Sequence, residues 1–139
     1  WASVLADWDV LHRISDYPDA VCRVDIDHTQ QEKDLLVAIA CAIKERADSA
    51  QRFLQAASTG PNESVKLIGK CVNSLLARDM TALVDDVAGY LKHYQKVDFP
   101  KPKLTNKISV YGSFLFHFAR HRGLSVEIPA AFTDHIVKV

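Results

Sequence analysis

Positive side chains gather in one stretch of this 139-residue chain, between Lys92 and Arg122. Seven Lys and Arg residues lie in that stretch against one acid, Asp98, although the whole chain has a formal net charge of zero. Aromatic, Thr and Asn side chains are interleaved with the cations. Lysine and arginine side chains among aromatic and polar residues are typical phosphate-binding groups, so the composition predicts a polyanionic partner.

The centre of this stretch has the sequence KPKLTNK over 101–107. Pro100 and Pro102 predict an exposed loop over 97–104, and we expect Thr105 or Asn106 to cap the helix that follows. Amides at a helix N-terminus bind phosphate, and nearby lysines strengthen that binding. An ordinary solvated loop and helix end is the alternative interpretation, and it stays open at this point.

Few other residues could bind a metal or take part in catalysis. His117 and His121 lie four apart, a spacing that two metal ligands can share, but no third ligand is close in the sequence, so we expect two surface histidines. Asp pairs occur at 7 and 9, 25 and 27, and 85 and 86, and neighbours so close on a helix point to different faces. The sequence contains no phosphate-binding glycine loop and no Cys/His metal framework. It therefore predicts no catalytic residue, no metal and no cofactor in this chain.

The two halves of the chain differ in charge. Residues 1–61 hold six Lys and Arg against ten Asp and Glu, whereas residues 62–139 hold eleven against seven. We expect an acidic helical extension over 1–58 and a basic domain over 62–139, or one continuous domain.

The cysteines and the hydropathy of the chain indicate the cellular compartment. Cys22, Cys41 and Cys71 are widely spaced among apolar residues, which predicts reduced thiols in the core. No apolar run reaches the roughly 18 residues that span a membrane, and no signal peptide is visible, so we expect a soluble cytoplasmic protein. Because the chain begins at Trp1 and not at Met, we also expect a piece of a longer polypeptide.

Apolar residues at helical spacing predict five or six helices with short connections, and therefore an all-α bundle. The longest expected helix runs from Gln30 to about Ser58, with Thr29 and Glu32 as a capping box. Gly123 is predicted to end a helix in the left-handed conformation. The other helices are expected over 2–15, 65–77, 81–94, from 105 or 106 to 122, and from 130 onwards, and a short extended segment over 21–27.

Residues Leu104 to Pro129 resemble the last long helix of the core-binding domain of tyrosine recombinases, the phage integrase family. The residues that keep the family's register are Asn106, Phe116, Phe118, Ala119, Gly123 and Pro129. Residues 64–76 and 78–91 look like earlier helices of the same domain, so the resemblance covers roughly 62–130. It implies a SAM-like bundle that clamps one side of duplex DNA, in a parent site-specific recombinase whose catalytic residues belong to a separate domain.

The basic stretch and the resemblance together predict the DNA contacts Lys66, Lys70, Lys101, Lys103, Thr105, Asn106, Lys107, Arg120 and Arg122. Such binding should weaken steeply with salt. A helical protein-interaction module, which docks a partner chain or another copy through Trp1, Trp8 and Phe132, is the alternative function. Cations on one face of the bundle would favour DNA, and scattered cations would favour the module. The three phenylalanines at 114, 116 and 118 are expected in the core or at its rim.

Overall fold

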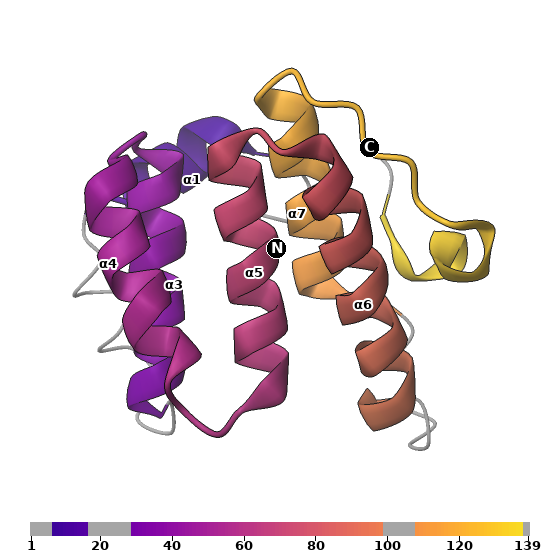
Figure 1. Ribbon diagram of the computed structural model, residues 1–139. Coiled ribbons are helices and arrows are strands. Elements are labelled where there is room, and N and C mark those ends of the chain that lie inside the picture. Colours follow the sequence, from indigo (N-terminus) through magenta and orange to yellow (C-terminus); the bar gives the residue numbers. More distant parts are fainter. Residues whose placement is uncertain (1–6, 17–28, 99–107, 138–139) are drawn as a thin grey trace.

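The computed structural model describes residues 7–16, 29–98 and 108–137, and in them it confirms the all-α bundle (Figure 1). These residues form six α-helices and one 3-10 helix. The helices are α1 (Trp8–Ile14), α3 (Gln30–Ile43), α4 (Ala47–Ser58), α5 (Glu63–Ala77), α6 (Met80–Asp98), α7 (Val110–His121) and the 3-10 helix η2 (Ala130–His135). The extended segment expected over 21–27 lies outside the described residues.

The start of α3 is the capping box that the sequence predicts. Thr29 N–H donates to Glu32 Oε2 at 2.8 Å, and Glu32 N–H donates to Thr29 Oγ1 at 3.3 Å. Two of the amides at the helix start are thereby satisfied by side chains. This local signal fixes the first residue of the helix.

The single helix expected over 30–58 is wrong, because α3 ends at Ile43 and α4 begins at Ala47. Between them Glu45 has a φ of 57°, the left-handed conformation that ends a helix. The amide of Glu45 donates to the carbonyl of Ala42 at 3.1 Å. After this turn α4 lies beside α3, so the apolar faces of the two helices pack against each other (Figure 1).

The boundaries around the basic stretch also differ from the prediction. Helix α6 continues through Asp98, so Val97 is helical and does not begin a loop. The expected cap at Thr105 or Asn106 is wrong, because Ser109 caps α7 and its Oγ accepts from Gly112 N–H at 3.0 Å. Ser109 is fully buried, and its own amide donates to the carbonyl of His135 at 2.8 Å. A tertiary contact therefore selects this cap.

The end of α7 follows the prediction. Gly123 has a φ of 73°, and its amide donates to the carbonyl of Arg120 at 2.9 Å. The next amide, of Leu124, returns to Ala119 at 2.9 Å, which completes a Schellman turn. The helix expected from 130 is the short 3-10 helix η2, because the chain becomes extended at Ile136 and runs against the start of α7.

One continuous hydrophobic core joins the described parts of both halves of the chain. Side chains from α3, α4, α5, α6 and α7 contribute to it, and its largest fully buried members are Phe118, Leu35, Leu75, Leu83, Leu91 and Leu115. Phe114 and Phe118 are core residues and Phe116 is half-buried, as expected.

Two of the three cysteines belong to this core. Cys41 and Cys71 are buried free thiols, and burial raises the pKa of both. Cys22 lies outside the described residues. Within the described part of the chain, no helix combines the length and the apolar character that crossing a membrane requires.

Candidate nucleic-acid interface

A groove of about 430 Å³ lies between α4 and α5. Three cations line it: Arg52 from α4, and Lys66 and Lys70 from α5. The rest of the described lining is uncharged and consists of Gln51, Leu54, Gln55, Ser58, Val65, Gly69 and Asn73. None of the described lining residues is acidic, and Glu63, 3.7 Å from Lys66, is the carboxylate paired with one of the three cations, so the lining carries a net positive charge that attracts anions.

Helix geometry places the two lysines of α5 together. Lys66 and Lys70 are four residues apart and therefore share one face of the helix. Lys66 is half-buried, with its Nζ 3.7 Å from Glu63 Oε2, and Lys70 is exposed. Gly69 between them has no side chain, and a Cβ there would meet Leu54 Cδ2 only at 3.7 Å. Gly69, which is buried, and Leu54 therefore pack close together along the groove.

Neutral donors accompany the cations. Gln51 Nε2 of α4 donates to Asn73 Oδ1 of α5 at 3.4 Å, so these amides face each other across the groove. Gln55 is exposed on α4 one turn after Gln51. Amide side chains of this kind donate to phosphate oxygens in protein–DNA interfaces. The groove thus combines charged and neutral phosphate-binding groups.

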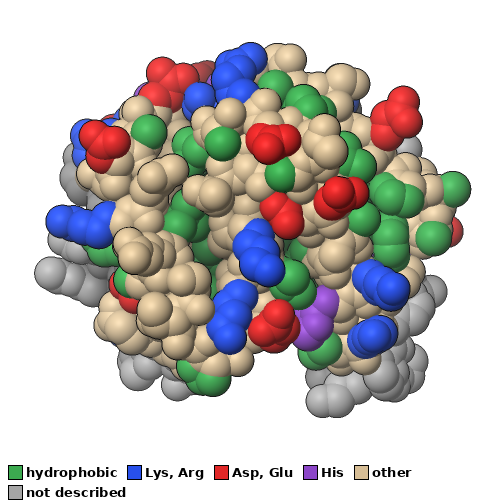
Figure 2. Space-filling model, viewed as in Figure 1, with side chains coloured by type: hydrophobic (Ala, Val, Ile, Leu, Met, Phe, Trp, Pro, Cys, Tyr) green, Lys and Arg blue, Asp and Glu red, His purple; other side chains and the backbone are tan. Residues whose placement is uncertain are grey.

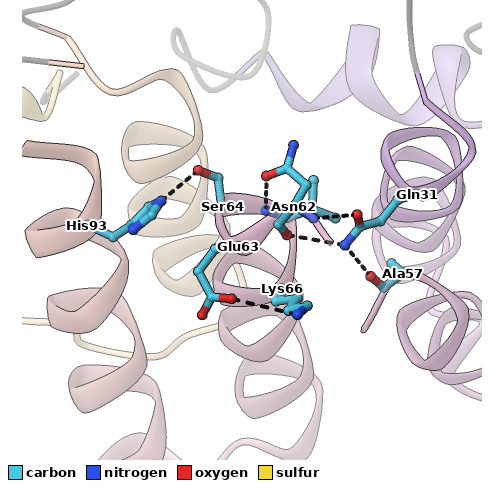
Figure 3. Close-up of polar contacts among 8 residues, drawn as sticks. Gln31, Ala57, Asn62, Glu63, Ser64, Lys66 and His93 are labelled. Atoms are coloured by element: carbon cyan, nitrogen blue, oxygen red, sulfur yellow. Dashed lines mark hydrogen bonds and ion pairs between the residues drawn. The ribbon is translucent and has the colours of Figure 1, made fainter. Parts of the chain in front are cut away.

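A buried glutamine of α3 fixes the turn that joins α4 to α5 (Figure 3). Gln31 Nε2 donates to the carbonyls of Ala57 at 2.7 Å and Asn62 at 3.2 Å, and Gln31 Oε1 accepts from Asn62 N–H at 2.8 Å. A Cβ at Gly60 would lie 2.2 Å from Gln31 Cδ, so only glycine leaves room for this side chain. Gln31 is 7% exposed, and its three hydrogen bonds hold the end of α4 and the start of α5 in position.

The positive surface extends from α5 to the end of α6. Figure 2 shows Lys and Arg side chains over the lower halves of these two helices. Lys92 and Lys96 are exposed in the last turns of α6, and His93 between them shares a hydrogen bond of 3.0 Å with Ser64 at the start of α5 (Figure 3). The start of α5 and the end of α6 therefore lie side by side, and Figure 2 shows an acidic side chain among the cations of this region.

The structure brings only some of the predicted DNA contacts together. Lys66 and Lys70 share the groove, whereas Arg120 and Arg122 lie at the end of α7. Arg120 is exposed, with its guanidinium 5.6 Å from the ring of Phe116. The side chain of Arg122 is 18% exposed, with its Nη1 3.5 Å from Glu45 Oε1. The other predicted contacts, Lys101, Lys103, Thr105, Asn106 and Lys107, lie outside the described residues.

Arg52 is the groove cation that the sequence did not reveal. It lies in the acidic half of the chain, on what looks like the middle of one long helix. The turn at Glu45 brings α4 back across the bundle and beside α5. Only this tertiary arrangement places Arg52 opposite Lys66 and Lys70.

The histidines of α7 play structural roles. The expectation that His117 lies on the surface is wrong, because His117 is buried and its Nε2 donates to the carbonyl of Val137 at 2.8 Å. His121 is exposed and stacks on Trp8, with ring centroids 4.2 Å apart. In the described parts of the chain, no three His, Cys, Asp or Glu residues come together as a metal site would require.

Exposed apolar surface lies on another side of the bundle. Trp8 and Phe132, two of the expected docking residues, pack against the core, and Trp1 lies outside the described residues. An apolar groove of about 280 Å³ instead runs between α1, α3 and α7. Ile14 and Val110 at this groove are 45% and 50% exposed.

No protein-family model, curated protein or solved structure matches this chain.

Proposed function

We propose that this chain binds double-stranded DNA and contacts the phosphate backbone through the groove between α4 and α5. The observation that carries the proposal is the convergence of Arg52, Lys66 and Lys70 on one groove whose described lining has no acidic residue. Positive charge collected in this way binds polyanions and is the usual footprint of a nucleic-acid-binding surface.

The arrangement suits a phosphate backbone better than an isolated anion. Lys66 and Lys70 are one turn apart, about 6 Å along the helix axis, so each can contact a different phosphate. Lys92 and Lys96 of α6 extend the positive surface beyond the groove. Because backbone contacts carry no sequence information, the binding should be largely independent of DNA sequence.

The resemblance to the core-binding domain of tyrosine recombinases supports the same function. In that family a helical bundle holds one side of the duplex, while a separate domain cuts and rejoins the strands. The proposal therefore includes a site-specific recombinase as the parent protein and assigns no catalytic residue to this chain. The predicted contacts at 101–107 would extend the interface, whereas Arg122 is left out because it lies at the end of α7 and does not line the groove.

The test is the fluorescence anisotropy of a labelled random duplex titrated with the chain at low salt. We expect the double variant Lys66→Gln, Lys70→Gln to bind at least about tenfold more weakly, because each lysine supplies a charge-assisted contact. The matched control is Arg13→Gln, since Arg13 is an exposed cation of α1 outside the groove. Equal affinities for the two variants would contradict the proposal.

A protein-interaction module is the second candidate, and the apolar groove between α1, α3 and α7 is the observation that favours it. Binding there would depend mainly on apolar burial and would be much less sensitive to salt than a phosphate interface. Ile14→Ser would weaken such an interaction. It should leave the duplex affinity measured by anisotropy unchanged.

A further inference from the structure

A second polar cavity, of about 410 Å³, lies at the other end of α5. It forms where three helices end, with Lys44 and Glu45 following α3, Arg78 following α5, and Arg122 following α7. The rest of the described lining is His12, Ile43, Phe118 and His121. This cavity shares no lining residue with the α4–α5 groove, so the two are separate.

Hydrogen-bond donors dominate the cavity. Lys44, Arg78 and Arg122 carry positive charge, and Glu45 is the only carboxylate of the described lining. Arg122 Nε is buried without a hydrogen-bond partner among the described residues, which costs free energy. The Nη1 of Arg122 lies 3.5 Å from Glu45, longer than a strong charge-assisted hydrogen bond.

The C-terminal carbonyls of the three helices do not need these cations as hydrogen-bond donors. Each of the three helices closes with backbone amides that return to its last carbonyls, so no arginine side chain is needed there. The amides of this kind are Glu45 and Arg46 after α3, Arg78 and Asp79 after α5, and Gly123 and Leu124 after α7.

Lys44 is the cation of this cavity with the closest partners, whereas Arg122 has the longer ion pair with Glu45. Its Nζ donates to Asp16 Oδ1 at 2.7 Å and to His12 Nδ1 at 2.9 Å. The hydrogen bond from Lys44 lowers the pKa of Asp16 from its ordinary value. The guanidinium groups of Arg78 and Arg122 are therefore the donors that a ligand could use.

We propose that this cavity binds a small phosphorylated anion, with Arg78 and Arg122 as its phosphate-binding residues. Guanidinium groups match phosphate oxygens through paired N–H donors. The cavity volume lies in the range of small-molecule sites. In the structure Glu45, which is 78% exposed, is the carboxylate next to Arg122, and its side chain can turn to solvent when the ligand enters.

The test is isothermal titration calorimetry of the chain with inorganic pyrophosphate. We expect Arg78→Gln to weaken binding at least about tenfold, because a charge-assisted hydrogen bond is lost. Glu45→Gln should strengthen binding, since it removes the carboxylate that competes for Arg122. Opposite shifts from two neighbouring exposed residues would not follow from a general loss of structure.

Three outcomes would overturn the proposal. The first is absence of binding at millimolar pyrophosphate, and the second is an affinity that neither variant changes. The third is competition between pyrophosphate and a short duplex, which would make the cavity part of the DNA interface. The double variant Lys66→Gln, Lys70→Gln should leave pyrophosphate binding unchanged, so failure of the DNA proposal and failure of this one are distinguishable.

Discussion

At the residue scale, the proposed interface depends most directly on Gln31. Its amide makes three hydrogen bonds to backbone groups of Ala57 and Asn62, and these groups hold the end of α4 beside the start of α5. Its partners lie 26 and 31 residues away along the chain. Helical spacing places Gln31 on the same face as Leu35, but it does not identify these distant backbone partners, so this role could not be predicted.

Replacing Gln31 tests that role. We expect Gln31→Leu to lower the free energy of unfolding by about 3 kcal/mol, because one buried amide and two carbonyls lose their partner. The measurement is urea denaturation, in which the midpoint should fall while the m-value stays constant. Gln30→Leu is the matched control and should change stability little. Equal small effects at both positions would show that the turn is held in another way.

The relative position of predicted site residues follows from the sequence where helical spacing alone decides it. Lys66 and Lys70 share a face because they are four residues apart on one helix. Arg52 was missed because its position depends on how α4 folds back, and Arg122 was assigned to DNA although the structure places it beside Glu45. Charge composition identifies candidate cations, but only packing decides which of them meet.

At the scale of the elements, periodicity predicts helices more reliably than their interruptions. The apolar face continues from α3 into α4, and no Gly or Pro marks the break. Glu45 takes the left-handed conformation that glycine usually provides, so the usual stop signal is missing. The cap of α7 was misplaced for a related reason, since Ser109 is selected by its contact with the backbone of His135.

The turn at Glu45 leads to a stability prediction of definite sign. We expect Glu45→Gly to have a free energy of unfolding about 1 kcal/mol higher than that of Glu45→Gln, because glycine adopts a positive φ without the strain of a Cβ. Both variants lose the ion pair between Glu45 and Arg122, so their difference reports the backbone strain alone. If residues 30–58 formed one helix, glycine at 45 would instead lower stability by about 1 kcal/mol. Chemical denaturation of the two variants distinguishes these cases.

Replacing a native glycine of α6 provides another stability test. Gly89 lies inside this helix with a negative φ, and a Cβ added there would meet nothing within 4 Å. We therefore expect Gly89→Ala to raise the thermal midpoint, with a gain of about 1 kcal/mol from helix propensity. Gly60→Ala should lower it, because the added carbon would collide with Gln31. A loss of stability on Gly89→Ala would show that this face of α6 is covered.

At the scale of the whole molecule, the all-α class followed from the sequence because nearly every apolar run has helical spacing. The described residues of both halves of the chain share one core, although residues 1–61 and 62–139 have net charges of opposite sign. This packing brings Arg52, the one cation of α4 in the acidic half, next to Lys66 and Lys70 of α5 in the basic half. The distribution of charge along the chain therefore does not map directly onto the surface.

The salt dependence of duplex affinity is the measurement that tests the DNA proposal most directly. Each phosphate neutralised contributes about 0.9 to the slope of log affinity against log salt. The slope should therefore be steep for the unmodified chain and shallower by about 2 for the double variant Lys66→Gln, Lys70→Gln. Equal slopes for the two proteins, or an affinity that salt does not change, would contradict the claim that the groove between α4 and α5 binds the DNA backbone.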